Sequence, residues 1–175
     1  AIYDGKNSAL QNFPWKHRAE PDGLLYELNT TKTGYIVSGI GECTDKDIII
    51  TPMYNGKPVV SIGSYAFYYC SKLTEISIPN GVTTIESDIF SQCYALTNVS
   101  LPDSITSINS YAFSGCTSLT NITIPDSVTS IGSYAFQSCY NLESIIIPDS
   151  VTSIGSYAFS WCNSLESIII PNGIK

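Results

Sequence analysis

The chain has 175 residues, of which 43% are hydrophobic and only 13% charged, and its formal net charge is −7. This length fits a single domain, and the charged fraction is about half of that in an average globular domain. Residues 73–174 contain eight acidic side chains and no Lys or Arg, which argues against binding to nucleic acid or anionic lipid, and no run of 18 apolar residues predicts a membrane span.

The N-terminal part of the chain, up to position 40, does not repeat. Residues 1–23 are polar apart from a few aromatic side chains and predict an N-terminal extension. Residues 24–28 (LLYEL) and 35–40 (YIVSGI) predict two strands around the turn-forming stretch NTTKTG. We expect this hairpin to cover the open edge of the following structure, so that residues 24–53 form a cap and a lead-in.

From position 54 onward the sequence repeats with a 23-residue period. Proline, phenylalanine and cysteine each recur independently at one position of the unit. These positions are Pro79, Pro102, Pro125, Pro148 and Pro171, then Phe67, Phe90, Phe113, Phe136 and Phe159, and finally Cys70, Cys93, Cys116, Cys139 and Cys162. Residues 54–175 therefore predict about five repeat units and a C-terminal stub, PNGIK.

The first part of each unit predicts a short strand. In the third unit Leu119, Ile122 and Ile124 nearly alternate with polar residues, which is typical of a strand with one buried face. Pro125 ends the strand because it lacks an N–H donor. Asp126 and Ser127 then favour a turn in which their side chains bond to the backbone.

The second part of each unit returns the chain to the next strand. Val128 and Ile131 are expected to be buried on the far side, and Gly132 indicates either a positive φ or a crowded position. Ser133 is expected to cap a single helical turn over residues 134–136. Since no unit can bury its apolar side alone, stacking of equivalent units in register is needed to close the core.

The pattern LxxIxIPxxVxxIGxxAFxxC resembles the BspA-like, or Treponema-type, leucine-rich repeat, and residues 41–60 resemble the lead-in of such proteins. The resemblance covers about residues 41–174. It implies a right-handed leucine-rich repeat solenoid with short parallel strands, capped by the N-terminal hairpin. It also implies a secreted or cell-surface bacterial protein that takes part in adhesion. Departures from the pattern fall in the earlier units: Glu86, Asp88, Ile89 and Asn109.

The cysteines carry no pattern of a metal or redox site. Five of the six recur once in each repeat unit, and none forms a CxxC pair. We expect a column of buried free thiols that pack as small hydrophobic side chains, because stacked parallel side chains rarely reach disulfide geometry.

Other residues with catalytic or metal-binding chemistry give no convincing site. His17 is the only histidine and has no recognisable partner. Glu143 and Glu166 lie one repeat apart but have no predicted pocket. The column Asp103, Asp126 and Asp149 is interpreted as turn residues bonding their own amides, with calcium as the weaker alternative. The sequence therefore predicts no enzyme, no cofactor and no metal site.

Two surfaces are candidates for binding. The first is formed by the outward positions of the strands, which change from polar to partly apolar along the chain. They are Glu75, Ser77, Asn98, Ser100, Asn121, Thr123, Ser144, Ile146, Ser167 and Ile169. The second and weaker candidate is an aromatic column that either binds a ligand or shields the turn. It consists of Tyr65, Tyr111, Tyr134, Tyr157 and Trp161.

The leading functional hypothesis is an extracellular or cell-surface adhesion module that binds a host matrix protein, a cell-surface protein or a glycan. The alternative is a structural spacer or assembly segment of a larger surface protein. The unfinished last unit also suggests self-association through an uncapped C-terminal end. Because fold alone does not determine function, these hypotheses rest partly on the family resemblance.

Overall fold

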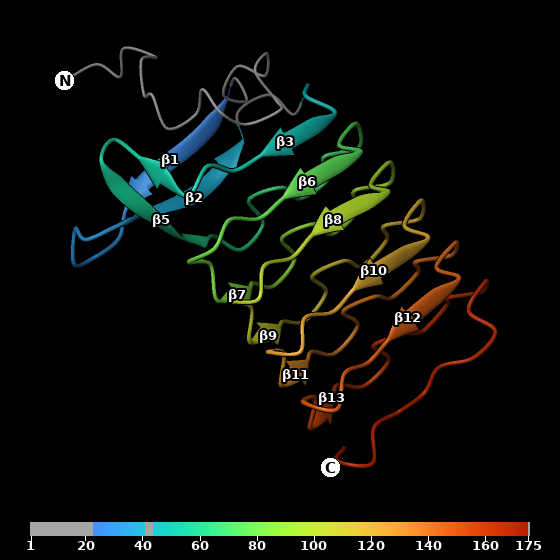
Figure 1. Ribbon diagram of the computed structural model, residues 1–175. Coiled ribbons are helices and arrows are strands. Elements are labelled where there is room, and N and C mark those ends of the chain that lie inside the picture. The colour runs from blue at the N-terminus through green and yellow to red at the C-terminus, as the bar shows by residue number, and fades with distance from the viewer. Residues whose placement is uncertain (1–22, 41–43, 175) are drawn as a thin grey trace, which may run out of the picture.

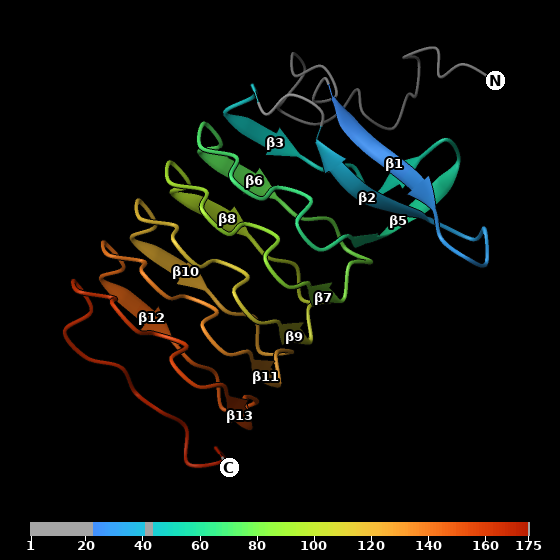
Figure 2. The same ribbon diagram turned by 180° about the vertical axis from the view of Figure 1, so that it is seen from behind.

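The computed structural model describes residues 23–40 and 44–174, which form a solenoid of about five turns with an N-terminal cap (Figures 1 and 2). The predicted extension with His17, and Cys43 of the lead-in, lie outside the described residues. Within the described ranges no segment is helical, and accordingly no helix could span a membrane.

The first row of parallel strands forms one side of the solenoid, which we call the strand face. Its strands are β3 (Asp47–Ile49), β6 (Glu75–Ser77), β8 (Asn98–Ser100), β10 (Asn121–Thr123) and β12 (Ser144–Ile146). Hydrogen bonds join β3, β6 and β8 into one sheet and β10 and β12 into another. Glu75 pairs with Asn98 and Asn121 pairs with Ser144, so the sequence period is also the register of the strands.

A second row of parallel strands, which the sequence pattern did not predict, runs along another side. It contains β7 (Thr84–Ile85), β9 (Ser107–Ile108), β11 (Ser130–Ile131) and β13 (Ser153–Ile154), joined in one four-stranded sheet. Hydroxyl side chains reinforce this side of the solenoid. Thr129 Oγ1, for example, donates to the Thr106 carbonyl at 3.2 Å, one repeat earlier.

The turns after Pro102, Pro125 and Pro148 depend on serine rather than aspartate. Ser127 Oγ donates to the Ile105 carbonyl of the preceding repeat at 2.6 Å, and Ser150 donates to Val128 at 2.7 Å. Asp126 is exposed and makes no such bond within the described residues. The interpretation that the aspartates bond their own turn amides was therefore wrong. The serine hydroxyl makes the side-chain bond to the backbone, and the aspartate side chain points into solvent.

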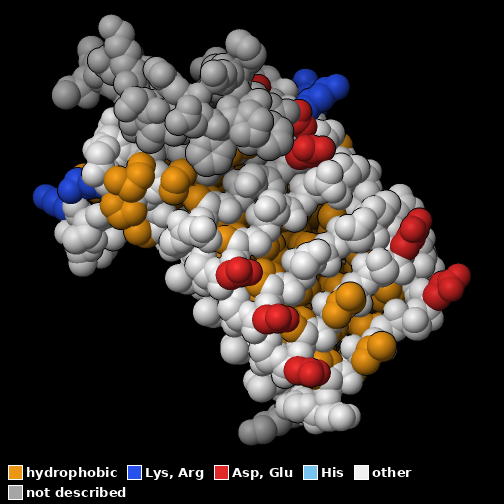
Figure 3. Space-filling model, viewed as in Figure 1, with side chains coloured by type: hydrophobic (Ala, Val, Ile, Leu, Met, Phe, Trp, Pro, Cys, Tyr) orange, Lys and Arg blue, Asp and Glu red, His pale blue; other side chains and the backbone are white. Residues whose placement is uncertain are grey.

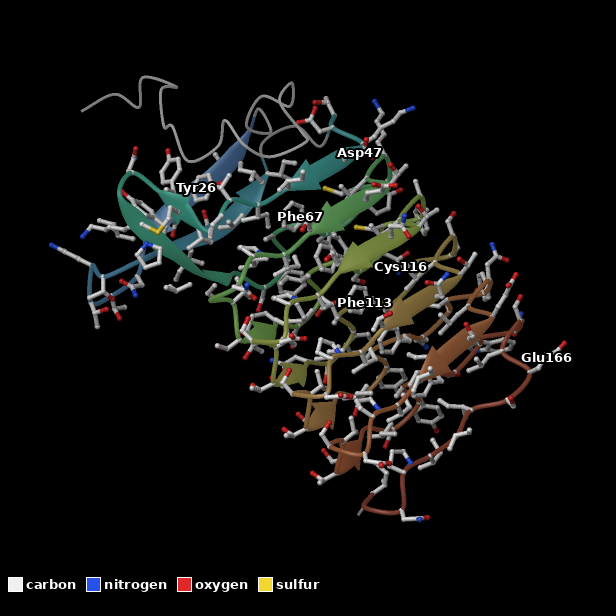
Figure 4. All side chains as sticks on the ribbon, in the orientation of Figure 1. Tyr26, Asp47, Phe67, Phe113, Cys116 and Glu166 are labelled. Atoms are coloured by element: carbon white, nitrogen blue, oxygen red, sulfur yellow. The ribbon has the colours of Figure 1, made fainter. Side chains whose placement is uncertain are left out.

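The core between the two rows is built from the repeated apolar positions. Four phenylalanines, from Phe67 to Phe136, are fully buried. Successive rings from Phe67 to Phe159 stack at centroid distances of 5.2–5.5 Å with interplanar angles of 3–22°. Figure 4 shows Phe67 and Phe113 inside the solenoid and Glu166 pointing away from it. This continuous stack couples each repeat to its neighbours.

The predicted helical turn over residues 134–136 is absent. Tyr134 has φ 59°, in the left-handed region, so the chain cannot continue as a right-handed helix. Successive backbone amides instead donate in turn to the next repeat and to their own repeat. The amides of Tyr134 and Phe136 donate to Ser156 and Ala158 of the next repeat, whereas Ala135 donates back to Gly132. The segment thus serves as a third line of contact between repeats.

Gly132 is needed for close packing rather than for an unusual φ. A Cβ at this position would lie 2.5 Å from the backbone nitrogen of Ser110, in the preceding repeat. Gly155 is similarly close to Ser133 N. Of the two explanations that the sequence left open, crowding is therefore the right one.

The predicted N-terminal hairpin is confirmed. Strands β1 (Leu24–Leu28) and β2 (Tyr35–Ile40) are antiparallel, and β2 pairs in parallel with β5 (Lys57–Ile62). Strand β4 (Met53–Tyr54) completes this sheet in the order β1-β2-β5-β4. The Gly63 amide donates to the Val37 carbonyl, just as Gly132 donates to Ile108 in a later repeat, so the hairpin takes the place of a preceding repeat.

The last repeat departs from the predicted strand face. Residues 165–171 form no strand, and their trace runs apart from β12 in Figure 1. Ser167 and Ile169 are therefore not on a strand, although both side chains are exposed. Their position cannot rely on a hydrogen-bonded ladder to β12, which is the interaction that aligns the earlier outward positions.

Candidate functional site

The strand face presents most of the predicted outward side chains to solvent. Ser77 is half-buried, and the other nine positions are exposed. The early strands are polar, and the Asn98 side-chain amide donates to the Glu75 carboxylate at 3.3 Å. The structure thus brings the positions from Glu75 to Ile146 onto one surface, and places Ser167 and Ile169 beyond its last strand.

An apolar patch lies at the C-terminal end of the strand face. Ile146 and Ile169 are 82% and 84% exposed, and Ile170 is 47% exposed. We call these three residues the isoleucine patch. Ile170 was not among the predicted outward positions. The equivalent residue one repeat earlier, Ile147, is buried at 5% exposure. Ile170 lies in the segment 165–171, which forms no strand. Exposed apolar side chains of this size often mark an interaction site.

Acidic side chains border the isoleucine patch. Figure 3 shows hydrophobic side chains at this end of the strand face with acidic side chains on two sides, and Lys and Arg side chains only toward the N-terminal end. Two exposed sets supply these acids, one from the proline turns and one beside the strands. They are Asp103, Asp126 and Asp149, and Glu143 and Glu166.

The aromatic column is divided into parts. Tyr111, Tyr134 and Tyr157 stack at centroid distances of 4.8 and 5.1 Å, with interplanar angles of 7° and 13°. Asp88 occupies the equivalent position between Tyr65 and Tyr111, so Tyr65 does not join the stack. Trp161 belongs to a different position of the repeat and is 65% exposed. The faces of the stacked rings are largely used against one another, which favours a structural role for this part of the column.

The left-handed conformation of Tyr134 gives a direct test of this geometry. We expect Tyr134→Gly to be more stable than Tyr134→Ala by about 1 kcal/mol, because glycine adopts a positive φ without the steric cost of a Cβ. Both variants lose the same ring stacking, so the difference reports the backbone alone. Urea unfolding followed by circular dichroism measures it. Equal stability of the two variants would contradict the positive φ.

The thiols of the cysteine column form hydrogen bonds to backbone carbonyls of the preceding repeat. The Cys93 thiol donates to the Phe67 carbonyl at 3.1 Å, and the three later cysteines repeat this contact at 3.2 Å. Burial raises the pKa of Cys93 to about 12 and that of Cys162 to about 11. Burial also raises the pKa of Cys116 well above its usual value. These thiols are poor nucleophiles and poor metal ligands.

The prediction of free thiols is confirmed for four cysteines of the column and wrong for the first. Cys93, Cys116, Cys139 and Cys162 are free, whereas Cys70 is disulfide-bonded. The geometry of stacked parallel side chains disfavours a disulfide only between cysteines one repeat apart. Since Cys93 is free, the bond of Cys70 is not made to its neighbour in the column.

No arrangement suited to catalysis or metal binding is found in the part of the chain that the structure describes. No three His, Cys, Asp or Glu side chains lie together there as metal ligands. A shallow groove of about 370 Å³ runs along β9, β11 and β13, where serines, isoleucines and glycines line it with Asn109. Its lining contains no ionisable side chain, so it offers no group for acid–base catalysis.

Comparisons with known proteins agree with this geometry. The family model of the BspA type leucine rich repeat region matches residues 54–175 in six copies. The structure of a leucine-rich repeat protein from T. pallidum is 33% identical with a TM-score of 0.84, and the match covers 90% of this chain and 73% of that one.

Two further structures come from other bacteria. A leucine-rich repeat protein from Bacteroides ovatus is 35% identical with a TM-score of 0.67, covering 88% of this chain and 47% of that one. A leucine rich cell surface protein from Faecalibacterium prausnitzii is also 35% identical, with a TM-score of 0.75 and coverage of 85% and 38%. The chain thus spans less than half the length of these two. No curated protein matches the chain.

The repeat matched by the family model and the fold shared with the T. pallidum protein coincide on the same residues of the solenoid. The chain therefore belongs to the family of BspA-type leucine-rich repeat proteins.

Proposed function

We propose that the chain is a non-catalytic recognition module, displayed at the cell surface or secreted, that binds a protein through its strand face. The isoleucine patch carries this proposal, because three exposed isoleucines at the end of an otherwise polar surface are unfavourable in water. The relative from Faecalibacterium prausnitzii is described as a cell surface protein, which supports a location outside the cell.

The charge of the repeats restricts the partner's chemistry. Residues 73–174 carry eight acids and no cation, so a basic partner surface is attracted and an acidic one is repelled. Apolar side chains of the partner would cover the isoleucine patch, while its Lys and Arg side chains would face the acids at the rim. A host matrix or cell-surface protein with a basic, partly apolar face fits this description.

The first test is the substitution Ile146→Asp. We expect it to weaken binding to the cognate protein at least tenfold, because it places a charge in the apolar centre of the contact and increases its acidity. Ile146 is 82% exposed, so the fold should tolerate the change. Binding of an immobilised chain to a panel of purified host matrix and cell-surface proteins, in 50 and 300 mM salt, provides the measurement.

The matched control is Ser100→Asp. Ser100 occupies the same strand position as Ile146, two repeats earlier, and is also exposed. The Ser100→Asp substitution introduces the same charge outside the isoleucine patch, so binding should change less than threefold. Equal losses in both variants would show only a general charge effect and contradict the assigned centre. If no protein of the panel binds, the alternative of a structural spacer is favoured.

A further inference from the structure

A second cluster of exposed aromatic side chains lies at the N-terminal end of the solenoid. Tyr65, Tyr68 and Tyr69 are 60%, 50% and 58% exposed, and Tyr94 of the next repeat is 38% exposed. Each ring contacts the next, with centroid distances of 5.9 Å for Tyr65–Tyr68, 6.3 Å for Tyr68–Tyr69 and 5.7 Å for Tyr69–Tyr94. We call these four residues the tyrosine patch.

The tyrosine patch differs from the stacked column in the orientation of its rings. Tyr65 and Tyr68 meet at 72°, and Tyr69 and Tyr94 at 80°. Rings in the later column lie within 13° of parallel and cover one another. An edge-to-face contact covers one face of only one of the two rings, and the four residues are 38–60% exposed, so the tyrosine patch has aromatic faces available for a ligand.

Two departures from the repeat pattern hold the outer rings in place. Asp88 stands where later repeats have tyrosine, and its carboxylate is hydrogen-bonded to the Tyr65 side chain. Gln92 lies in the same repeat as Asp88, at a position where the later repeats have Gly, Ser or Trp. Its Oε1 accepts a hydrogen bond of 2.6 Å from the Tyr94 hydroxyl. Rings that are fixed before binding lose less conformational entropy when a ligand arrives.

Tyr69 occupies a position where glycine would fit the backbone better. Its φ is 60°, and the equivalent residue two repeats later is Gly115, with φ 76°. A non-glycine residue in this region costs about 1–2 kcal/mol. The ring of Tyr69 is more than half exposed, so burial recovers little of this cost. The same positive φ recurs at Gln92, Gly115, Ser138 and Trp161, so the fold imposes it in every repeat, and neither the backbone nor burial accounts for an exposed aromatic ring at Tyr69.

From these observations we propose that the tyrosine patch binds a neutral glycan, at a site separate from the strand face. The open ring faces suit the C–H faces of pyranose sugars. The Gln92 side-chain amide keeps its N–H donors for sugar hydroxyls, since only its oxygen is hydrogen-bonded within the described residues. A basic peptide is the alternative ligand, because its cations would contact the rings through cation–π interactions, and the experiment below separates it from a sugar.

The decisive variant is Tyr69→Gly. It removes the central ring and relieves the positive φ, so the variant should be at least as stable as the parent chain while binding at least tenfold more weakly. Ser138→Gly is the matched control. Ser138 has φ 58° at the equivalent position and no aromatic ring, so the control should show a similar or larger gain in stability and unchanged binding.

Isothermal titration with cellohexaose, maltohexaose, chitohexaose and mannohexaose gives the affinities, and hexa-arginine tests the cationic alternative. Binding of at least one sugar that is lost in Tyr69→Gly and kept in Ser138→Gly and Ile146→Asp supports the proposal. No binding of any sugar, binding that survives Tyr69→Gly, or binding of hexa-arginine alone overturns it. Because Ile146→Asp leaves the tyrosine patch intact, failure here is distinguishable from failure of the strand-face proposal.

Discussion

Replacing Phe113 with alanine is expected to lower the free energy of unfolding by about 3–5 kcal/mol, the range for truncating a fully buried phenylalanine. The ring is 0% exposed and lies 5.3 Å from Phe90 and 5.2 Å from Phe136, measured between centroids. Its removal leaves a cavity between two repeats and breaks the stack that couples them. Urea unfolding measures the loss, and amide hydrogen exchange should show the repeats after Phe113 opening separately.

The matched control is Phe159→Ala at the end of the same stack. Phe159 is only partly buried, and its ring stacks on Phe136 alone. The expected loss is therefore smaller, about 2 kcal/mol. If Phe113→Ala does not fold, Phe113→Leu keeps most of the volume and should cost about 1.5 kcal/mol. Equal losses at the two phenylalanines would contradict the coupling of repeats through the stack.

Alkaline pH is expected to destabilise the protein through its buried thiols. The pKa of Cys93 is about 12 in the folded chain and about 8.5 in an unfolded one. Between these values the unfolded state loses a proton that the folded state keeps, so stability is complete below about pH 8.5 and falls as the pH rises toward 12. Urea unfolding between pH 7 and pH 11 measures the slope.

Cys93→Ala separates this thiol from the tyrosines and lysines that titrate in the same range. The variant should lose up to about 1.4 kcal/mol less stability per pH unit above pH 8.5 than the parent chain. Alkylation provides a second readout. At pH 7 the folded chain holds Cys93 as thiolate about 3000-fold less often than an unfolded chain does, and Cys162, with a pKa of about 11, should react first. Rapid modification of Cys93 in the native protein would refute the assignment.

Much of the fold could be predicted because the residues that contact one another between repeats recur at a regular interval in the sequence. Phe, Cys and Pro recur with one common period, and the structure pairs residues at the same interval. The hairpin cap was also predictable, since residues 24–28 and 35–40 flank a turn-forming stretch. Local patterns that are strong and repeated therefore determined the solenoid.

The parts that could not be predicted depend on contacts between repeats. The stretch 133–136 suggests a helical turn when considered alone, but Tyr134 is left-handed because its amide donates to Ser156 of the next repeat. Strands of the second row contain only two residues each, which is too short for any alternation to be detected. The crowding at Gly132 likewise involves backbone of the preceding repeat.

The candidate site shows the same division. Alternation placed Ser100, Thr123 and Ile146 on the outside of the strands, where the structure also has them. Ile170 is exposed where its counterpart Ile147 is buried, a difference that the identical sequence around the two residues does not encode. Anchoring of the tyrosine patch by Asp88 and Gln92 became visible only with the positions of their side chains.

The strict register between units has a consequence for how such a protein changes in evolution. Hydrogen bonds between units recur at fixed offsets, 22 residues from Ser127 to Ile105 and 26 residues from Cys116 to Phe90 for example. A gene segment that encodes one whole unit can therefore be duplicated or lost without altering the remaining contacts. Residues 125–147 and 148–170 differ at only four positions, which makes their coding segments suitable for unequal recombination. Each event would change the length of the rod by about 4.8 Å, while the insertion of a single residue would break the register of its unit.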